Sequence, residues 1–133
     1  MKFVDAVAFC KTKFKGIGRL YEPRSKISNI EAGSIARQIS PNQPFWIGIR
    51  ARVHDEDRKF YYISQGPKKL GNSLDFNNWS DGGEGEYSGN KDCVAILKFN
   101  GFEWNSIDCT EDHFAICQVD VAGKEYHTVK KSK

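Results

Sequence analysis

Apolar residues in the first part of the chain recur every three or four positions, which predicts two amphipathic helices. We expect the first helix to end at Gly16. The second is predicted to begin with the capping box Ser28-Asn29-Ile30-Glu31, in which the serine and glutamate side chains satisfy backbone donors. The expected apolar faces are Phe3, Val7, Cys10 and Phe14 in the first helix and Ala32, Ile35, Ala36 and Ile39 in the second.

Short apolar runs in the rest of the chain predict strands. Residues 45–49 are continuously apolar, as is typical of a strand buried in a sheet. Residues 64–91 are irregular and rich in Gly, Asn, Ser and Asp, and a loop of that length in a compact domain is usually functional or disordered. The other predicted strands are 59–63, 94–99, 102–104 and 114–119.

Composition is that of a single globular domain. The 133 residues are 39% hydrophobic and 13% aromatic, enough to bury a core. No apolar run approaches the ~20 residues that cross a bilayer, so we expect no membrane span. The net charge of +3 does not favour a nucleic-acid partner. The three histidines have no recognisable nucleophile partner and no phosphate-binding glycine motif occurs, so we expect no enzyme.

A frame of cysteines, aromatic residues and glycine runs through the chain. Its segments are Cys10, Phe45-Trp46-Ile47-Gly48, Cys93, Trp104-Asn105-Ser106-Ile107-Asp108-Cys109 and Phe114-Ala115-Ile116-Cys117. In order and spacing, this frame resembles the C-type lectin-like domain over almost the whole chain. The resemblance implies an α+β fold with two helices, small antiparallel sheets and a long loop region that carries the function. Such a frame indicates the fold and leaves the ligand open.

The four cysteines allow three pairings, and the sequence alone does not choose among them. The resemblance implies two disulfides, Cys10 with Cys117 and Cys93 with Cys109. A zinc site is disfavoured, because no close CxxC or HxxxH pair occurs. Disulfides belong to oxidising compartments, so we expect a secreted, extracellular protein. Residues 1–6 do not form a secretory signal, and we expect an export signal to be missing or to lie outside this chain.

The ends of the chain depart from the family's usual order. Members begin with a strand, carrying a Gly-Lys-x-Tyr/Phe pattern, that pairs with the final strand. Here a similar stretch, Gly123-Lys124-Glu125-Tyr126, follows the last strand instead. We expect residues 1–119 to form the C-type lectin-like domain and residues 120–133 to belong to it as a strand that is circularly permuted or exchanged with a neighbouring copy. A disordered basic tail is the third alternative.

The resemblance also implies a site to check residue by residue. Sugar-binding members hold a calcium ion with carboxylate and amide oxygens of the long loop. The corresponding triplet here is Glu84-Gly85-Glu86, without the proline that members carry. Lys91 stands where a glutamate is usual, and Ser106 stands where an aspartate follows Asn105. An ammonium group within ~4 Å would repel the ion, so we expect the usual site to be modified.

Acidic side chains nevertheless gather in this loop, and calcium remains a candidate cofactor. Asp81 adds to the same cluster, while the neighbouring glycines fit a solvated, flexible loop equally well. The side chains expected to hold calcium are Glu84, Glu86, Asp92 and Asn105.

Two functions therefore stay open. One is a lectin that binds a glycan through a modified calcium site, and the other is a calcium-independent module that binds an extracellular protein or matrix. Single lectin sites are weak, so a lectin would favour oligomers that gain avidity. Tyr87 joins the candidates because it projects from the glycine-rich loop without a framework role. The candidate ligand-binding residues are Glu84, Glu86, Tyr87, Lys91, Asn105 and Ser106.

Overall fold

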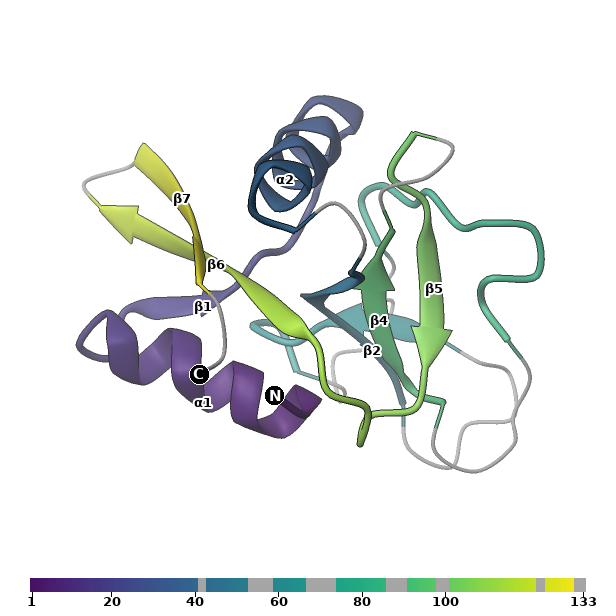
Figure 1. Cartoon of the computed structure of the whole chain (residues 1–133), viewed down its shortest axis with the longest axis horizontal. Helices are drawn as coiled ribbons and strands as arrows, with labels where there is room; N and C mark the ends of the chain where they lie inside the picture. Colours follow the sequence, from purple (N-terminus) through teal and green to yellow (C-terminus); the bar gives the residue numbers. More distant parts are fainter. Residues whose placement is uncertain are drawn as a thin grey trace.

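The protein is represented by a computed structural model in which two helices pack against one seven-stranded mixed sheet (Figure 1). The structure describes residues 1–40, 43–52, 59–66, 74–85, 91–97, 101–121 and 124–130. Within these residues the elements are α1 (Phe3–Lys13), β1 (Gly18–Leu20), α2 (Lys26–Ile39), β2 (Phe45–Ala51), β3 (Phe60–Tyr62), β4 (Cys93–Ile96), β5 (Trp104–Ile107), β6 (Phe114–Val121) and β7 (Lys124–Lys130).

β2 is the centre of the sheet. It pairs antiparallel with β3 and β4 and parallel with β6, where Phe45 lies beside Phe114. The strand order is β1-β6-β2-β4-β5, with β3 beside β2 and β7 beside β6. The sequence predicted small antiparallel sheets, whereas the parallel pairing of β2 with β6 joins the strands into one mixed sheet. The expected α+β architecture is confirmed, and its strands form one continuous sheet.

α1 is tethered to the sheet by its buried face. Phe3, Ala6 and Cys10 lie inward at helical spacing, and the Cys10–Cys117 disulfide joins the helix to β6 with a Cα–Cα distance of 5.4 Å. The second predicted disulfide, Cys93–Cys109, is also present. Both pairings implied by the resemblance are therefore confirmed.

α2 begins earlier than the sequence pattern predicted. Its N-cap is Ser25, and the capping box joins Ser25 to Ser28, so the predicted box from Ser28 to Glu31 is wrong. Ser28 fits the third helical position because its hydroxyl accepts from the Ser25 N–H at 3.1 Å, as a glutamate would in the usual box.

The buried face of α2 also differs from the prediction. Asn29 and Gly33 are buried beside Ala32 and Ala36, while Ile39 is 40% exposed. Gly33 is needed because an added Cβ would lie 2.1 Å from the ring of Phe102. The asparagine is accepted in the core because its side chain has partners on both sides, as described below for the site.

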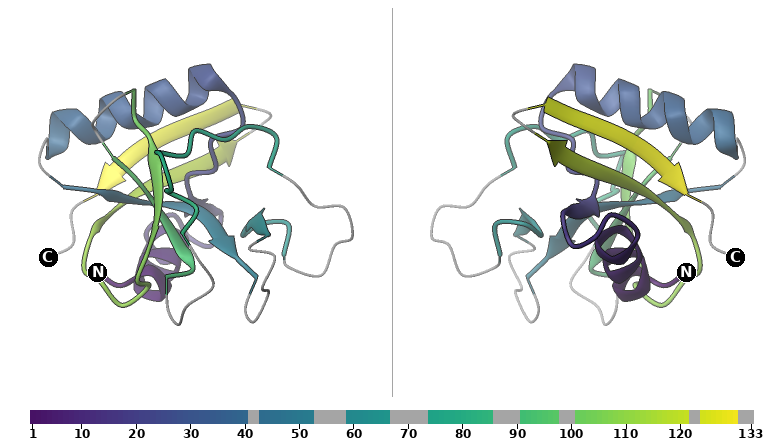
Figure 2. Two further views of the ribbon diagram at one scale, coloured as in Figure 1. Left: turned by 90° about the vertical axis from the view of Figure 1, so that its right-hand side faces the viewer. Right: turned by 90° about the vertical axis from the view of Figure 1, so that its left-hand side faces the viewer.

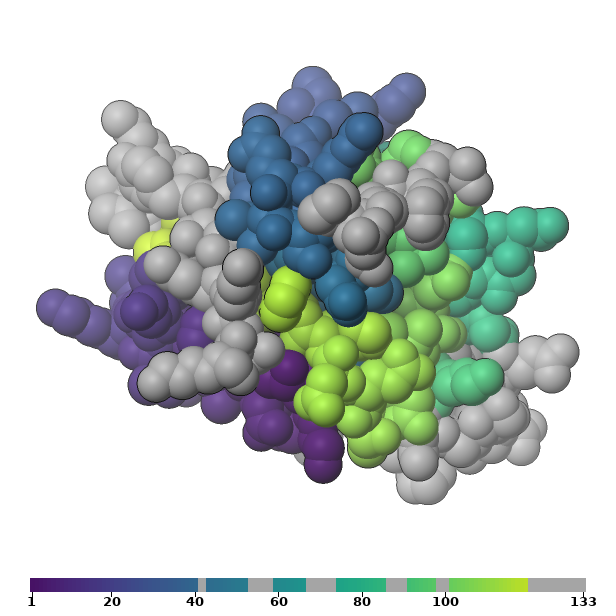
Figure 3. Space-filling view, in the orientation of Figure 1, coloured from purple at the N-terminus to yellow at the C-terminus, as the bar shows by residue number. Residues whose placement is uncertain are grey.

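The core has two clusters that share the sheet. One contains Phe45, Tyr62 and Trp104, and the other contains Phe3 and Trp46 with both cysteines of the α1–β6 disulfide. The two helices lie on opposite sides of the strands β6 and β7 (Figure 2). On the face shown in Figure 3, the yellow-green residues around the start of β6 lie below α2 and beside α1. No helix in the described part of the chain combines the length and apolarity needed to cross a membrane.

β7 extends the sheet beyond β6. The two strands form an antiparallel hairpin within one chain, with registers running from Val121 beside Lys124 to Ala115 beside Lys130. α2 contacts this added strand (Figure 2). That the strand replaces the family's usual first strand by permutation or exchange stays a prediction.

Candidate functional site

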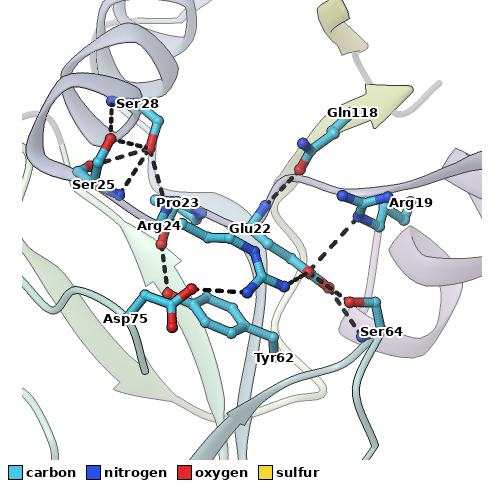
Figure 4. Close-up of polar contacts among 10 residues, drawn as sticks. All are labelled: Arg19, Glu22, Pro23, Arg24, Ser25, Ser28, Tyr62, Ser64, Asp75 and Gln118. Atoms are coloured by element: carbon cyan, nitrogen blue, oxygen red, sulfur yellow. Dashed lines mark hydrogen bonds and ion pairs between the residues drawn. The ribbon is translucent and has the colours of Figure 1, made fainter. Parts of the chain in front are cut away.

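A buried carboxylate holds the beginning of the long segment between β3 and β4 (Figure 4). The Glu22 side chain is 0% exposed and accepts hydrogen bonds from the backbone N–H and the hydroxyl of Ser64 at 2.9 and 2.7 Å. Arg24 donates to Glu22 at 2.9 Å and to Asp75 at 2.9 Å. The charge of Glu22 is thus compensated on one side while its oxygens fix the chain just after β3.

Tyr62 completes this anchor from the end of β3. Its hydroxyl donates to the carbonyl oxygen of Pro23 at 2.9 Å, and the guanidinium of Arg24 lies 4.1 Å from the centre of its ring. Burial, reinforced by the negative charge of Asp75, raises the pKa of Tyr62 to about 12. The tyrosine is therefore held neutral, as a donor, over the working pH range.

The second half of the long segment is fixed along β5. The backbone N–H of Trp104 donates to the carbonyl oxygen of Asn78 at 2.9 Å, and the backbone carbonyl of Trp104 accepts from the Ser80 N–H at 3.0 Å. The Ser106 N–H donates to the carbonyl of Gly83 at 2.7 Å. Residues 78–83 thereby run beside β5 as an added, irregular edge of the sheet.

The side chain of Trp104 ties this edge to α2. Its indole N–H donates to the amide oxygen of Asn29 at 2.7 Å, and the amide nitrogen of Asn29 donates to the carbonyl of Phe102 at 3.1 Å. Every polar group of this buried pair therefore has a partner. Sequence reasoning missed Asn29 and Glu22 because each reads locally as an exposed polar residue.

Gly83 lets the segment approach β5 closely. A Cβ at this position would lie 2.5 Å from the carbonyl oxygen of Trp104 and 2.8 Å from the side-chain oxygen of Asn105. Any other residue would push the segment away from the strand. The glycine-rich composition, which sequence reasoning attributed to flexibility, here permits close packing.

An open depression of about 370 Å³ lies where this segment faces β5 and the start of β4. Two of the predicted contact residues on β5, Asn105 and Ser106, line it together with Lys91, so three predicted residues meet at one place. The full lining is Ser80, Asp81, Gly82, Gly83, Gly85, Lys91, Asn105 and Ser106. We call this the long-loop depression.

Hydrogen bonds within the protein already occupy the polar groups on one wall. The hydroxyl of Ser106 donates to the carbonyl oxygen of Glu84 at 2.9 Å, and the hydroxyl of Ser80 donates to the side-chain oxygen of Asn105. These bonds close the segment onto β5 through protein groups alone.

The charge beside the depression is mixed. Lys91 is close enough to contribute to the lowered pKa of Asp108, after the larger effects of the backbone N–H and hydroxyl of Thr110. Asp81 supplies a carboxylate to the same lining. The depression therefore presents a cation, an anion and neutral hydrogen-bonding groups within one small area.

The described donors do not fit a calcium ion. No three His, Cys, Asp or Glu side chains lie close enough to hold a metal within the residues that the structure describes. Asp81 is the one carboxylate in the described lining, and Lys91 shares that lining. Calcium requires six to eight oxygens, several of them charged.

The remaining predicted ligands have different positions. Asp92 does not line the depression, and its carbonyl oxygen accepts from Ala51 N–H at 2.8 Å. Glu84 contributes its backbone carbonyl to Ser106, and its side chain is exposed. Glu86 and Tyr87 lie outside the described residues.

Comparison with known families decides the wider identity of the chain. The model of the family described as the lectin C-type domain matches residues 1–119. The chain belongs to the C-type lectin domain family. This C-type lectin domain carries the two disulfides, the two helices and the long loop segment that the resemblance implied.

Solved C-type lectin structures share this fold at low sequence identity. The C-type lectin CEL-I from Cucumaria echinata matches with a TM-score of 0.71 and 16% identity, over 88% of this chain and 81% of that one. The cow carbohydrate-recognition domain of CD23, solved with GlcNAc2Man3 oligosaccharide, gives 0.66 and 21%, over 92% and 83%. A calcium-independent type II antifreeze protein gives 0.65 and 18%, over 88% and 77%.

Proposed function

We propose that this C-type lectin domain is an extracellular recognition module that binds a glycan or a protein segment at the long-loop depression, without calcium at that site. The observation that carries the proposal is the pairing of Ser106 with the Glu84 carbonyl beside Lys91. A lysine and a serine occupy positions where calcium-binding members carry carboxylates. The loop is instead fastened by a direct hydrogen bond.

The chemistry of the lining supports a polar ligand. Lys91 offers a cation, Asp81 an acceptor, and Asn105 an amide, around a space of about 370 Å³. Such groups recognise hydroxyl-rich or charged ligands by hydrogen bonds without an ion between them. The similar solved structures include both a carbohydrate-recognition domain solved with an oligosaccharide and an antifreeze protein named as calcium-independent. The fold is therefore compatible with glycan binding and with function without calcium.

The disulfides support an extracellular setting. Cys10–Cys117 and Cys93–Cys109 form only where thiols are oxidised, as in secreted proteins. A single shallow site gives weak binding, so we propose that avidity between several copies assists a glycan-binding role.

Thermal unfolding with calcium and then with chelator tests the proposal. The wild-type protein is expected to unfold at the same temperature in both. The double variant Lys91→Glu/Ser106→Asp restores two carboxylates, and calcium at a hundredfold excess over Kd then adds about 2.7 kcal/mol, or roughly 5 to 10 °C. Lys11→Glu makes the same lysine-to-glutamate change at an exposed position of α1, outside the depression, and should gain no calcium response.

A chelator-reversible rise in the wild-type protein would contradict the proposal. It would favour the modified calcium site built on Glu84, Glu86, Asp92 and Asn105, and glycan arrays with calcium would then follow. If the wild type is indifferent to calcium, the arrays are run with chelator present, together with extracellular protein libraries.

A further inference from the structure

A second pocket lies between α1 and the strands β2 and β3, and it shares no residue with the long-loop depression. Its volume is about 270 Å³, slightly below the range of drug-sized sites, so it suits a small ligand. The lining residues are Phe3, Val4, Val7, Arg50, Tyr61 and Ile63. We call it the α1–β3 pocket.

The floor of the α1–β3 pocket is apolar. Phe3 is 2% exposed and belongs to the core cluster, against which Val7 and Ile63 pack. Val4 lies one helical turn from Val7 and is 71% exposed, so it forms the rim. An apolar group entering here would bury surface against a wall that is already fixed by the fold.

One cation interrupts these apolar walls. Arg50 lies directly opposite Tyr61 across the β2–β3 pair, so the two side chains leave the sheet on the same face. The Arg50 guanidinium carbon lies 5.8 Å from the centre of the Phe3 ring. Its Nε–H is buried and has no hydrogen-bond partner among the described residues.

Arg50 lines the pocket, and an anion is the ligand that suits a guanidinium best, because a carboxylate accepts charge-assisted hydrogen bonds from it. Tyr61 lies within electrostatic reach of the same charge: burial raises the pKa of its hydroxyl, and Arg50 and Arg52 oppose that rise. The phenol therefore stays protonated beside the guanidinium, as a second donor. An apolar floor combined with convergent donors calls for an amphipathic anion.

We propose that the α1–β3 pocket binds a small monocarboxylate carrying a short apolar group. The apolar group packs on Phe3, Val7 and Ile63, and the carboxylate pairs with the guanidinium of Arg50. This site is independent of calcium and of the function proposed for the long-loop depression.

The test uses the whole chain and two small probes, 4-phenylbutyrate and its uncharged amide. Titration followed by two-dimensional amide NMR should show saturable shifts at residues of α1, β2 and β3 with the acid, with a Kd of roughly 1 mM. The amide should bind at least tenfold more weakly. Equal binding of acid and amide, or no saturation by either up to about 10 mM, would overturn the proposal.

Two pairs of variants test the named residues. Arg50→Met should weaken binding of the acid at least tenfold, while Arg37→Met, at an exposed position of α2, should leave it unchanged. Because Arg50 lies on the central strand β2, its replacement could disturb folding. A second pair of variants therefore changes the exposed rim residue Val4, which lies outside the core. Val4→Asp should bind the acid about threefold more weakly than Val4→Asn does, because the added carboxylate repels the ligand. Equal Kd values for the acid in these two variants would contradict the proposal.

A free acid and the carboxyl terminus of a protein chain present the same chemistry. N-acetylphenylalanine mimics the second source, and its Kd is compared with that of 4-phenylbutyrate. Tighter binding of the amino-acid probe assigns the pocket to a chain terminus, and tighter binding of phenylbutyrate assigns it to a free acid.

Discussion

Ser106 and Glu84 are joined by a hydrogen bond from a side-chain hydroxyl to a backbone carbonyl, 2.9 Å long, which fastens the long loop to β5. Ser106 is only 8% exposed, so this bond is partly shielded from water. It joins the two positions that the family resemblance had assigned to metal ligands. The loop therefore keeps its place beside the strand through the protein's own groups.

Replacing Ser106 by alanine should release this fastening. Loss of the hydroxyl is expected to lower the free energy of unfolding by about 1 kcal/mol, and hydrogen exchange at the Gly85 amide should quicken. Urea denaturation and amide exchange measure the two effects. Ser34→Ala on α2 serves as the control, and an unchanged Gly85 exchange rate in the Ser106 variant would contradict the assigned role.

Glu22 should contribute more to stability than Asp75, the exposed carboxylate that also pairs with Arg24. Glu22→Gln keeps the size of the side chain but removes the charge that faces Arg24 and Arg19. Because Arg24 is 34% exposed, we expect a loss of about 2 kcal/mol, below the range for fully buried pairs. Asp75→Asn, at a side chain 54% exposed, should cost no more than about 0.5 kcal/mol. Equal losses in urea denaturation would contradict this ranking.

The hydroxyl of Tyr62 should lose its proton only at high pH. Its pKa of about 12 in the folded state exceeds the ordinary 10.0, so the folded protein keeps a proton that the unfolded chain releases. The stability that this contributes is complete below pH 10 and is lost as pH rises towards 12. Near-ultraviolet phenolate absorbance should show a smaller late step in Tyr62→Phe than in the wild type, because the raised pKa of Tyr61 leaves a second late-titrating tyrosine. A late step of unchanged amplitude in the variant would contradict the assignment to Tyr62.

The C-terminal strand should be part of the folding unit, as a permuted first strand would be. Ending the chain at Val121 removes β7 and leaves the edge of β6 unpaired, so we expect a loss of at least ~2 kcal/mol and a tendency to associate. Thr128→Pro should mimic the deletion, because proline removes a backbone donor, whereas Thr128→Val should not. Unchanged unfolding would favour a disordered tail, and stability that depends on protein concentration would favour strand exchange.

The parts of the fold that the sequence predicted are those encoded locally or by a spaced frame. The spacing of Phe3 and Cys10 is a property of one helix, and the cysteine frame resembles a known pattern, so α1 and both disulfides were predicted. The start of α2 was misplaced because two serines three residues apart can act as a capping box. The choice between Ser25 and Ser28 depends on contacts outside the helix, such as the bond from Tyr21 to the Ser28 carbonyl.

Three of the predicted site residues lie together in the structure, and their role in binding a ligand stays a prediction; the hydrogen bonds at this site were not predicted. Lys91, Asn105 and Ser106 line one depression, as their positions relative to the cysteine frame implied. The hydroxyl of Ser106 donates to a backbone oxygen of Glu84, and because every residue has such an oxygen, the sequence does not indicate which one is used. Likewise, Glu22 and Asn29 are buried because distant partners, Ser64 and Trp104, satisfy them after folding.

The two ends of the long segment are clamped independently of what lies between them. Ser64 is held by Glu22 at the exit from β3, and Cys93 is held by its disulfide at the entry to β4. Because β3 and β4 both pair with β2, the two clamps lie on strands that flank the same central strand, and the entropy of closing the intervening chain grows only slowly with its length. The framework can thus serve as a display scaffold, in which natural variation or a designed library replaces the segment while the supporting architecture is inherited intact.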